Sequence, residues 1–199
     1  MPIINEPLVY SEASLAKINE KMAGVGYSHL DWSAPELEDV RCEIRNHYRD
    51  VQRLQCVYCQ GAIMHRSAAG APVEHIVPKS QYLSFMFEPK NLCVICPDCN
   101  EYKGAQEVLM QPVMVAPRVN YPTSSNAFRI VHPHYDEYED HIMRHNRVYV
   151  DRSVKGGYTI FLCNLNRFYR RFGRCDEFVN DVALVERSER FYDEGRVDI

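Results

Sequence analysis

Two Cys-x-x-Cys pairs, Cys56/Cys59 and Cys96/Cys99, constrain this chain most. Each pair bends the backbone so that two thiolates reach one ion, and two pairs complete a tetrahedral four-cysteine zinc site. Closing the segment 60–95 between them costs about 3 kcal/mol in chain entropy, whereas structural zinc contributes on the order of 10–16 kcal/mol. We therefore predict a structural Zn²⁺. A zinc hydrolase is disfavoured, because four thiolates leave the ion no open position.

The remaining cysteines follow no ligand pattern. Cys93 lies three residues before Cys96 and is the alternative to it as a zinc ligand. The unpaired set is expected to be small apolar core residues: Cys42, Cys93, Cys163 and Cys175. The N-terminus lacks the basic and apolar stretches of a secretory signal, so we expect a cytoplasmic location and no structural disulfides.

Charge narrows the possible partners. The net charge is −4 and the pI is about 6.1. This charge is not typical of a protein that binds nucleic acid by bulk charge, so any such binding needs a local basic patch or a partner. The chain is 46% hydrophobic, which is ordinary for globular domains. It contains no run of 18 apolar residues, so the sequence predicts no membrane span.

The chain divides into three segments. Residues 1–54 predict helices, one from about Ser11 to Ala23 and one starting with Ser33 as N-cap and Pro35 in the first turn. One apolar face follows at spacings of three or four: Leu37, Val40, Ile44, Tyr48, Val51 and Leu54. Residues 55–110 hold the cysteine pairs.

Residues 111–199 begin with a proline-rich linker over 111–127. The pattern then predicts strands at Phe128–Val131, Arg147–Asp151 and Tyr158–Leu162, with a turn at Gly156-Gly157. Helices are predicted from near Asn164 or Asn166 and from about Asp176 to Phe191.

Polar residues suited to catalysis or metal binding lie between and beside the cysteine pairs. They are Glu74, His75, Asn91, Asn100 and Lys103. Taken alone, His75 is more often a hydrogen-bonded strand histidine than a catalytic one. The combination of an acid-His pair, a later Asn and an amide directly after the second cysteine pair is much rarer.

The stretch from Cys56 to Lys103 resembles the HNH, or ββα-metal, nuclease motif, in its H-N-N form. The resemblance implies an α+β fold: a zinc-stapled ββα core flanked by an N-terminal helical segment and a C-terminal mixed segment. It implies that His75 is the general base with Glu74 as its acidic neighbour, and that Asn91 fixes the loop. Asn100, with Glu74, would bind the catalytic metal, and Lys103 would face phosphate.

The last position of the motif is an amide rather than the imidazole that names the family. Amide oxygen suits hard ions, so we predict Mg²⁺ or Mn²⁺ at the catalytic centre. A His75 near the ordinary pKa of about 6.5 would be partly neutral at physiological pH and could take a proton from water. The cation would neutralise charge that develops on the scissile phosphate.

Two further segments carry candidate functions. Arg167, Arg170 or Arg171, and Arg174 recur at helical spacing and predict a grip on a nucleic-acid backbone. The alternative is a solvated face paired with acids such as Asp176 and Glu177. The ligand-rich segment His132–His141 admits a second metal site, but its spacing matches no ligand pattern, so a structural or partner-binding role is favoured.

The wider layout resembles the HNH subunit of Septu-type anti-phage defence systems. This resemblance rests on the N-terminal helical segment and on four short motifs: Glu74-His75, His132-Pro133, Gly156-Gly157 and Leu165-Asn166-Arg167. The resemblance implies an ATPase partner that controls the nuclease. We expect a DNA endonuclease, with a homodimer as one route to double-strand cleavage. The alternatives are RNA cleavage and a zinc-stabilised binding module without catalysis.

Overall fold

Two helices form the N-terminal part of the structure, a computed structural model that describes residues 4–112 and 119–173. Helix α1 (Glu12–Ala23) begins with a cap from Ser11, whose hydroxyl accepts the Ser14 N–H at 3.3 Å. Helix α2 (Glu38–Val51) buries one apolar face, as its spacing predicts: Val40, Ile44 and Tyr48. Within the described ranges, no helix has the length and apolar character needed to cross a membrane.

The predicted start of α2 at Ser33 is wrong. Two 3₁₀ turns, η1 (His29–Ser33) and η2 (Pro35–Leu37), precede the helix. Ser28 and Asp31 form a capping box on η1, and the Arg41 guanidinium donates to the carbonyls of Trp32 and Ala34. These bonds hold the segment that precedes the helix in tight 3₁₀ turns, so the α-helix begins only at Glu38.

A small antiparallel sheet lies beneath α2. Strand β1 (Val73–His75) pairs with β2 (Leu92–Val94), with Val73 opposite Val94 and His75 opposite Leu92. The Gln52 amide fixes α2 to this sheet, because it accepts the Val94 N–H at 2.8 Å and donates to the Val94 carbonyl at 2.7 Å. The loop between the strands holds η3 (Leu83–Phe85) and η4 (Pro89–Asn91), and helix α3 (Pro97–Lys103) follows β2.

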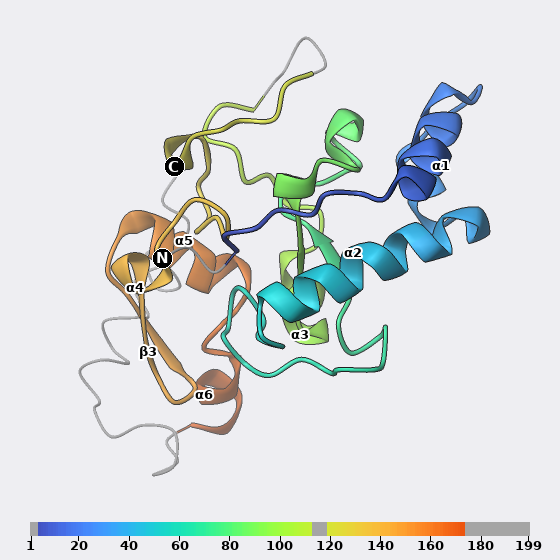
Figure 1. The fold of residues 1–199 in the computed structure, drawn as a ribbon. Helices are drawn as coiled ribbons and strands as arrows, with labels where there is room; N and C mark the ends of the chain where they lie inside the picture. Colours follow the sequence, from blue (N-terminus) through green and yellow to red (C-terminus); the bar gives the residue numbers. More distant parts are fainter. Residues whose placement is uncertain (1–3, 113–118, 174–199) are drawn as a thin grey trace.

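The C-terminal elements pack on the side of the molecule opposite α1 and α2 (Figure 1). They are η5 (Ser125–Ala127), α4 (Tyr138–His141), β3 (Ile142–His145), β4 (Val148–Asp151), α5 (Val154–Leu162) and α6 (Arg167–Phe172). Strands β3 and β4 form an antiparallel hairpin. The predicted strand at 147–151 and the helix from Asn166 are confirmed, whereas β3 was not predicted.

The predicted strand Tyr158–Leu162 and the turn at Gly156-Gly157 are wrong, because both lie inside α5. Ser153 caps this helix by accepting the Gly156 N–H at 3.0 Å. A Cβ on Gly156 would lie 1.8 Å from the His141 carbonyl oxygen. The glycine therefore allows α5 to lie directly against α4.

The predicted strand Phe128–Val131 is also wrong. Only a single bridge joins Phe128 to Leu109, and the Val131 N–H is satisfied by the Thr159 hydroxyl at 2.8 Å. A side chain of α5 thus takes the place of a partner strand. Helices and two small antiparallel sheets make the fold α+β. The predicted helix Asp176–Phe191, with Arg174 and Cys175, lies outside the described residues.

Candidate metal centre and active site

The four cysteines of the two pairs converge on one point. The Sγ atoms of Cys56, Cys59, Cys96 and Cys99 all lie within 4.8 Å of one another, and those of Cys59 and Cys96 are 3.7 Å apart. A tetrahedral ion with Zn–S bonds of about 2.3 Å requires sulfurs about 3.8 Å apart. The cluster can hold a metal such as zinc. Cys93 is buried in β2 and does not belong to this group, so the alternative ligand is excluded.

Local backbone geometry positions the first cysteine pair. The chain turns tightly after Cys59, where Gln60 has a φ of 55°, and the Cys56 N–H donates to the Gly61 carbonyl at 2.9 Å. We call this turn, residues 56–61, the knuckle. The second pair begins α3, where the Cys96 sulfur accepts the Cys99 N–H at 3.4 Å. The knuckle and the start of a helix thus present two thiolates each.

Three side chains from the C-terminal segment brace the knuckle. The Tyr138 hydroxyl donates to the Tyr58 carbonyl at 2.7 Å, and the Tyr149 hydroxyl donates to the Cys59 carbonyl at 2.6 Å. The Arg144 guanidinium donates to the Gln60 carbonyl at 2.6 Å. These bonds fix the backbone that carries the first two ligands.

Arg167 lies against the cysteine cluster. Its guanidinium is 3.9 Å from Cys96 Sγ and 4.0 Å from Cys99 Sγ, and it donates to Asp98 at 3.1 Å. Four thiolates around one divalent ion leave a net charge of −2, which this cation partly offsets. The charged group of Arg167 is thus engaged by the cluster and by Asp98, and its expected grip on nucleic acid stays a prediction.

His75 lies at the end of β1 and is 5% exposed. Its Nε2 donates to the Met86 carbonyl at 3.1 Å. The Trp32 ring packs edge-on against the His75 ring, with 4.4 Å between the ring centroids. Burial, reinforced by the positive charges of Lys79 and Lys103, holds the pKa of His75 well below its usual range. The condition of an ordinary pKa is therefore not met, and burial favours the neutral form of the ring.

Glu74 and Lys103 form a buried ion pair. Lys103 also donates to the His75 carbonyl at 3.1 Å, and its side chain has no exposed surface. Burial raises the pKa of Glu74, and the Lys103 ammonium opposes that effect. The expectation that Lys103 faces phosphate is wrong, because the last turn of α3 points this side chain inward to compensate the Glu74 carboxylate.

Asn91 is buried and holds the loop between the strands. Its Oδ1 accepts the Val77 N–H at 2.7 Å, and its Nδ2 donates to the carbonyls of Val77 and Phe85 at 3.1 and 2.9 Å. The Asn91 carbonyl accepts the Ile76 N–H at 2.8 Å. Asn91 thus fixes the backbone that leaves His75 and acts through the loop rather than on the ring.

Asn100 is exposed on α3, one turn before Lys103. Residues three apart lie on the same side of a helix, so Asn100 shares the side from which Lys103 reaches β1. Arg170 lies on α6, where it lines a groove with Tyr102 of α3. Arg174 is outside the described residues.

Trp32 and Lys79 were not identified as site residues from the sequence. Trp32 contacts the His75 ring, and Lys79 acts on its charge. Trp32 is the only tryptophan of the chain, but it lies on a different segment from the motif. No spacing connects it to His75, so only the three-dimensional fold reveals the contact.

The segment His132–His141 is structural where it is described. His132 and His134 are buried, and Asp136 accepts the His132 N–H at 2.6 Å and pairs with Lys155 at 2.6 Å. Among the described residues, only the cysteine cluster groups His, Cys, Asp or Glu closely enough for a metal. The favoured structural role therefore fits better than a second metal site.

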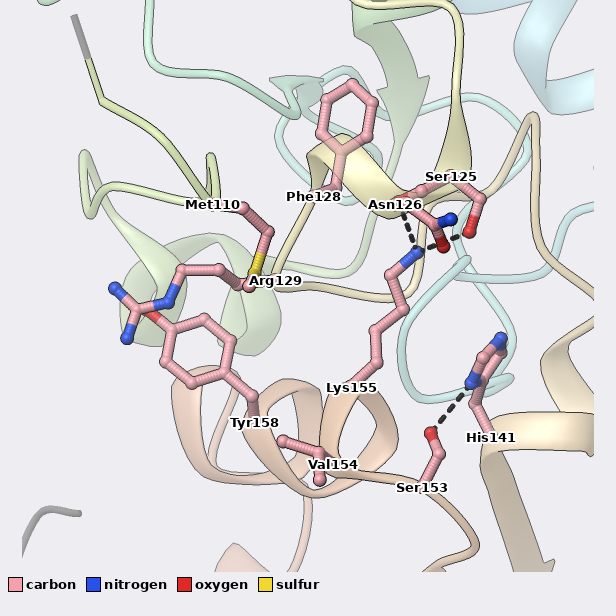
Figure 2. A pocket seen from close by; sticks show the side chains of 10 residues that line it. All are labelled: Met110, Ser125, Asn126, Phe128, Arg129, His141, Ser153, Val154, Lys155 and Tyr158. Carbon is pink, nitrogen blue, oxygen red and sulfur yellow. Dashed lines mark hydrogen bonds between the residues drawn. The ribbon is translucent and has the colours of Figure 1, made fainter. Parts of the chain in front are cut away.

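A cavity of about 450 Å³ opens beside this segment, at the start of α5. Figure 2 shows Lys155 reaching Ser125, and His141 turned toward the Ser153 hydroxyl at 2.7 Å. These polar groups satisfy one another. Nothing in the cavity adds to the constellation around His75.

Comparison with known proteins finds one informative similarity. The chain is 25% identical over 139 residues to the Septu protein PtuB of Bacillus thuringiensis. The match covers 70% of this chain and 44% of that protein, so the chain spans less than half of the relative's length. No protein-family model matches the chain, and no solved structure matches it.

Proposed function

We propose that this chain is a metal-dependent endonuclease of the HNH type that acts in anti-phage defence. The observation that carries the proposal is the link between β1 and α3. Lys103 bonds both the Glu74 carboxylate and the His75 carbonyl, one helical turn from the exposed Asn100. An acid and an imidazole from β1 and an amide from α3 follow one another along the chain in the order that the nuclease motif requires.

His75 would act as the general base. Its Nε2–H donates to Met86, which leaves the Nδ1 lone pair to accept a proton from water. The lowered pKa keeps that lone pair available at neutral pH. Asn91 would keep the ring in place by fixing the loop that carries Met86.

Asn100 and Glu74 would hold the catalytic cation. Asn100 offers an amide oxygen, and Lys103 occupies only one of the two Glu74 oxygens. Oxygen donors of this kind suit Mg²⁺ or Mn²⁺. Such an ion, when bound, supplies charge neutralisation at the phosphate.

The similarity to a Septu protein supports the defence role. The same resemblance leads us to propose an ATPase partner that controls cleavage. A regulated nuclease fits the net charge of −4, because recruitment by a partner replaces bulk attraction to nucleic acid. Cysteine-bound zinc would be structural in this protein.

The test is cleavage by the purified, zinc-loaded chain with Mg²⁺ or Mn²⁺, alone and with any ATPase that a neighbouring gene encodes, on plasmid, single-stranded DNA and RNA. His75→Ala should abolish cleavage while zinc content and melting temperature stay unchanged. His65→Ala, at an exposed histidine, is the matched control and should cut as the wild type does. Equal cleavage by His75→Ala and the wild type would refute the proposal.

A binding module without catalysis is the second candidate. It is favoured by the low exposure of His75 and by the buried ion pair that Glu74 forms with Lys103. This candidate predicts nucleic-acid or protein binding that His75→Ala leaves intact. It also predicts no cleavage of any substrate when the ATPase is present.

A further inference from the structure

We infer that the groove between α3 and α6 binds single-stranded nucleic acid, with unpaired bases on its aromatic rings and phosphates on its arginines. The inference rests on the proposed function and names the substrate class for it. The groove has a volume of about 430 Å³. Its walls include Tyr102 of α3 and Phe168, Arg170, Arg171 and Phe172 of α6.

The rings of this groove are unusually accessible. Phe172 is 64% exposed and Tyr102 is 44% exposed. Every base has a flat π face, so an exposed ring in a positive groove is a stacking platform that accepts any sequence. Neither ring is needed for the main hydrophobic core, to which neither belongs.

The charge of the groove is positive, although that of the chain is negative. Among the described residues, Arg167, Arg170 and Arg171 line it with a single acid, Asp98. That acid is already paired with Arg167, which also contacts the cysteine cluster. Arg171 lies over the Phe172 ring at 5.5 Å, so a cation and a stacking surface stand together. This is the local basic patch that an acidic chain needs in order to bind a polyanion.

The combination favours a single strand over a duplex. A duplex presents its phosphates and groove edges, while its base faces are stacked on one another and inaccessible to side chains. Arginines alone would suit either form, but exposed rings between them are useful only to unpaired bases. The groove shares α3 with Asn100, and a helix is only about 10 Å across. A strand held there would therefore lie close to the proposed cleavage site.

Fluorescence anisotropy tests the inference with a labelled single strand of about 12 nucleotides, within the usual site size for such strands, as DNA and as RNA, and a duplex of the same sequence. The protein is zinc-loaded His75→Ala without added Mg²⁺, so that nothing is cut. The single strands should bind more tightly than the duplex. Phe172→Ala and Arg171→Gln should each weaken that binding at least about fivefold, whereas Phe172→Trp should retain it.

Phe161→Ala and Arg66→Gln remove an exposed ring and an exposed arginine elsewhere, and should bind as the parent does. Zinc content and melting temperature report whether each variant is folded. Equal or tighter binding of the duplex, or unchanged binding by both groove variants, would overturn the inference.

The two proposals fail separately. Loss of cleavage in His75→Ala with unaffected binding by the groove variants would refute the groove alone. Groove-dependent binding of single strands by a wild-type protein that cuts nothing would refute the nuclease and leave the groove in place.

Discussion

The pair formed by Glu74 and Lys103 places two opposite charges where the solvent has little access. Removal of one partner leaves the other charge uncompensated in a medium of low dielectric constant. We predict that Lys103→Met destabilises the zinc-loaded protein by about 3–5 kcal/mol. Urea unfolding measures this change.

The double variant Glu74→Gln, Lys103→Met removes both charges and should recover much of the lost stability. A double variant no more stable than Lys103→Met would contradict the account. The double variant should be inactive if Glu74 serves the proposed catalytic ion, so its recovered stability is not accompanied by recovered activity.

The buried histidines make stability depend on pH. Burial lowers the pKa of His134 to about 4, whereas the unfolded chain has a value of about 6.5. Between these values the unfolded state binds more protons than the folded state, so stability falls as the pH falls. We predict a loss of about 2 kcal/mol from His134 between about pH 7.5 and pH 5.

Urea unfolding of the wild type and His134→Asn at both pH values, with zinc content measured alongside, tests this prediction. The variant is expected to be less stable at the higher pH, since the bond from His134 Nε2 to the Leu92 carbonyl changes. It should nevertheless lose less stability on acidification. An unchanged pH dependence would exclude His134 as the cause.

Single residues also mark what the sequence could not predict. Spacing favoured Cys96 over Cys93 as a zinc ligand but left Cys93 open, because Cys93 and Cys96 are also three residues apart. The structure decides between them, since Cys96 and not Cys93 belongs to the cluster. Spacing was insufficient for Lys103, which the resemblance to the nuclease motif led us to expect facing phosphate. The burial of Lys103 depends on the contact between α3 and β1. Residue spacing within α3 does not reveal that contact.

At the scale of elements, the knuckle and α3 each present two cysteines to the same candidate metal site. We predict that Cys59→Ser reduces bound zinc well below one ion per chain and lowers the melting temperature by more than about 10 °C, since zinc contributes on the order of 10 kcal/mol. Removal of zinc with a chelator should do the same to the wild type. Metal analysis and thermal unfolding are the measurements.

Cys42→Ser is the control for this change, because Cys42 lies on α2 outside the cluster. It should keep its zinc and melt within about 2 °C of the wild type, as a substitution away from the core does. If Cys59→Ser kept its zinc and its melting temperature, the four-cysteine cluster would not be a zinc site that stabilises the fold.

Elements were predictable where local signals and tertiary packing agree. The apolar face of α2 and the cap of α1 are local signals, and both helices form, although α2 begins later than predicted. Helix α5 was mistaken for a strand because its β-branched and aromatic residues favour strands. The Ser153 cap and the close approach that Gly156 permits override that preference.

At the scale of the molecule, one hydrophobic cluster contains residues of all three segments, such as Ile44, Val94 and Ile160. The tyrosines that brace the knuckle lie 80 and 90 positions further along the chain than the carbonyls they bond. We predict that Tyr138→Phe with Tyr149→Phe leaves the knuckle less restrained and lowers stability by about 2 kcal/mol.

The double variant should also release zinc faster to a competing chelator, which a colorimetric exchange assay measures. Tyr169→Phe, on α6, is the control and should exchange as the wild type does. Equal release rates in all three proteins would show that the tyrosines stabilise the fold without restraining the metal.

The distance in sequence between the knuckle and its braces has a consequence for synthesis. A ribosome makes all four cysteines before it makes Tyr138 and Tyr149, so the thiolates can meet zinc before the hairpin that supports them has folded. Zinc capture during translation would then proceed on a half-built site. We expect the yield of metal-loaded protein to follow zinc supply while the chain is growing more closely than zinc added after its release.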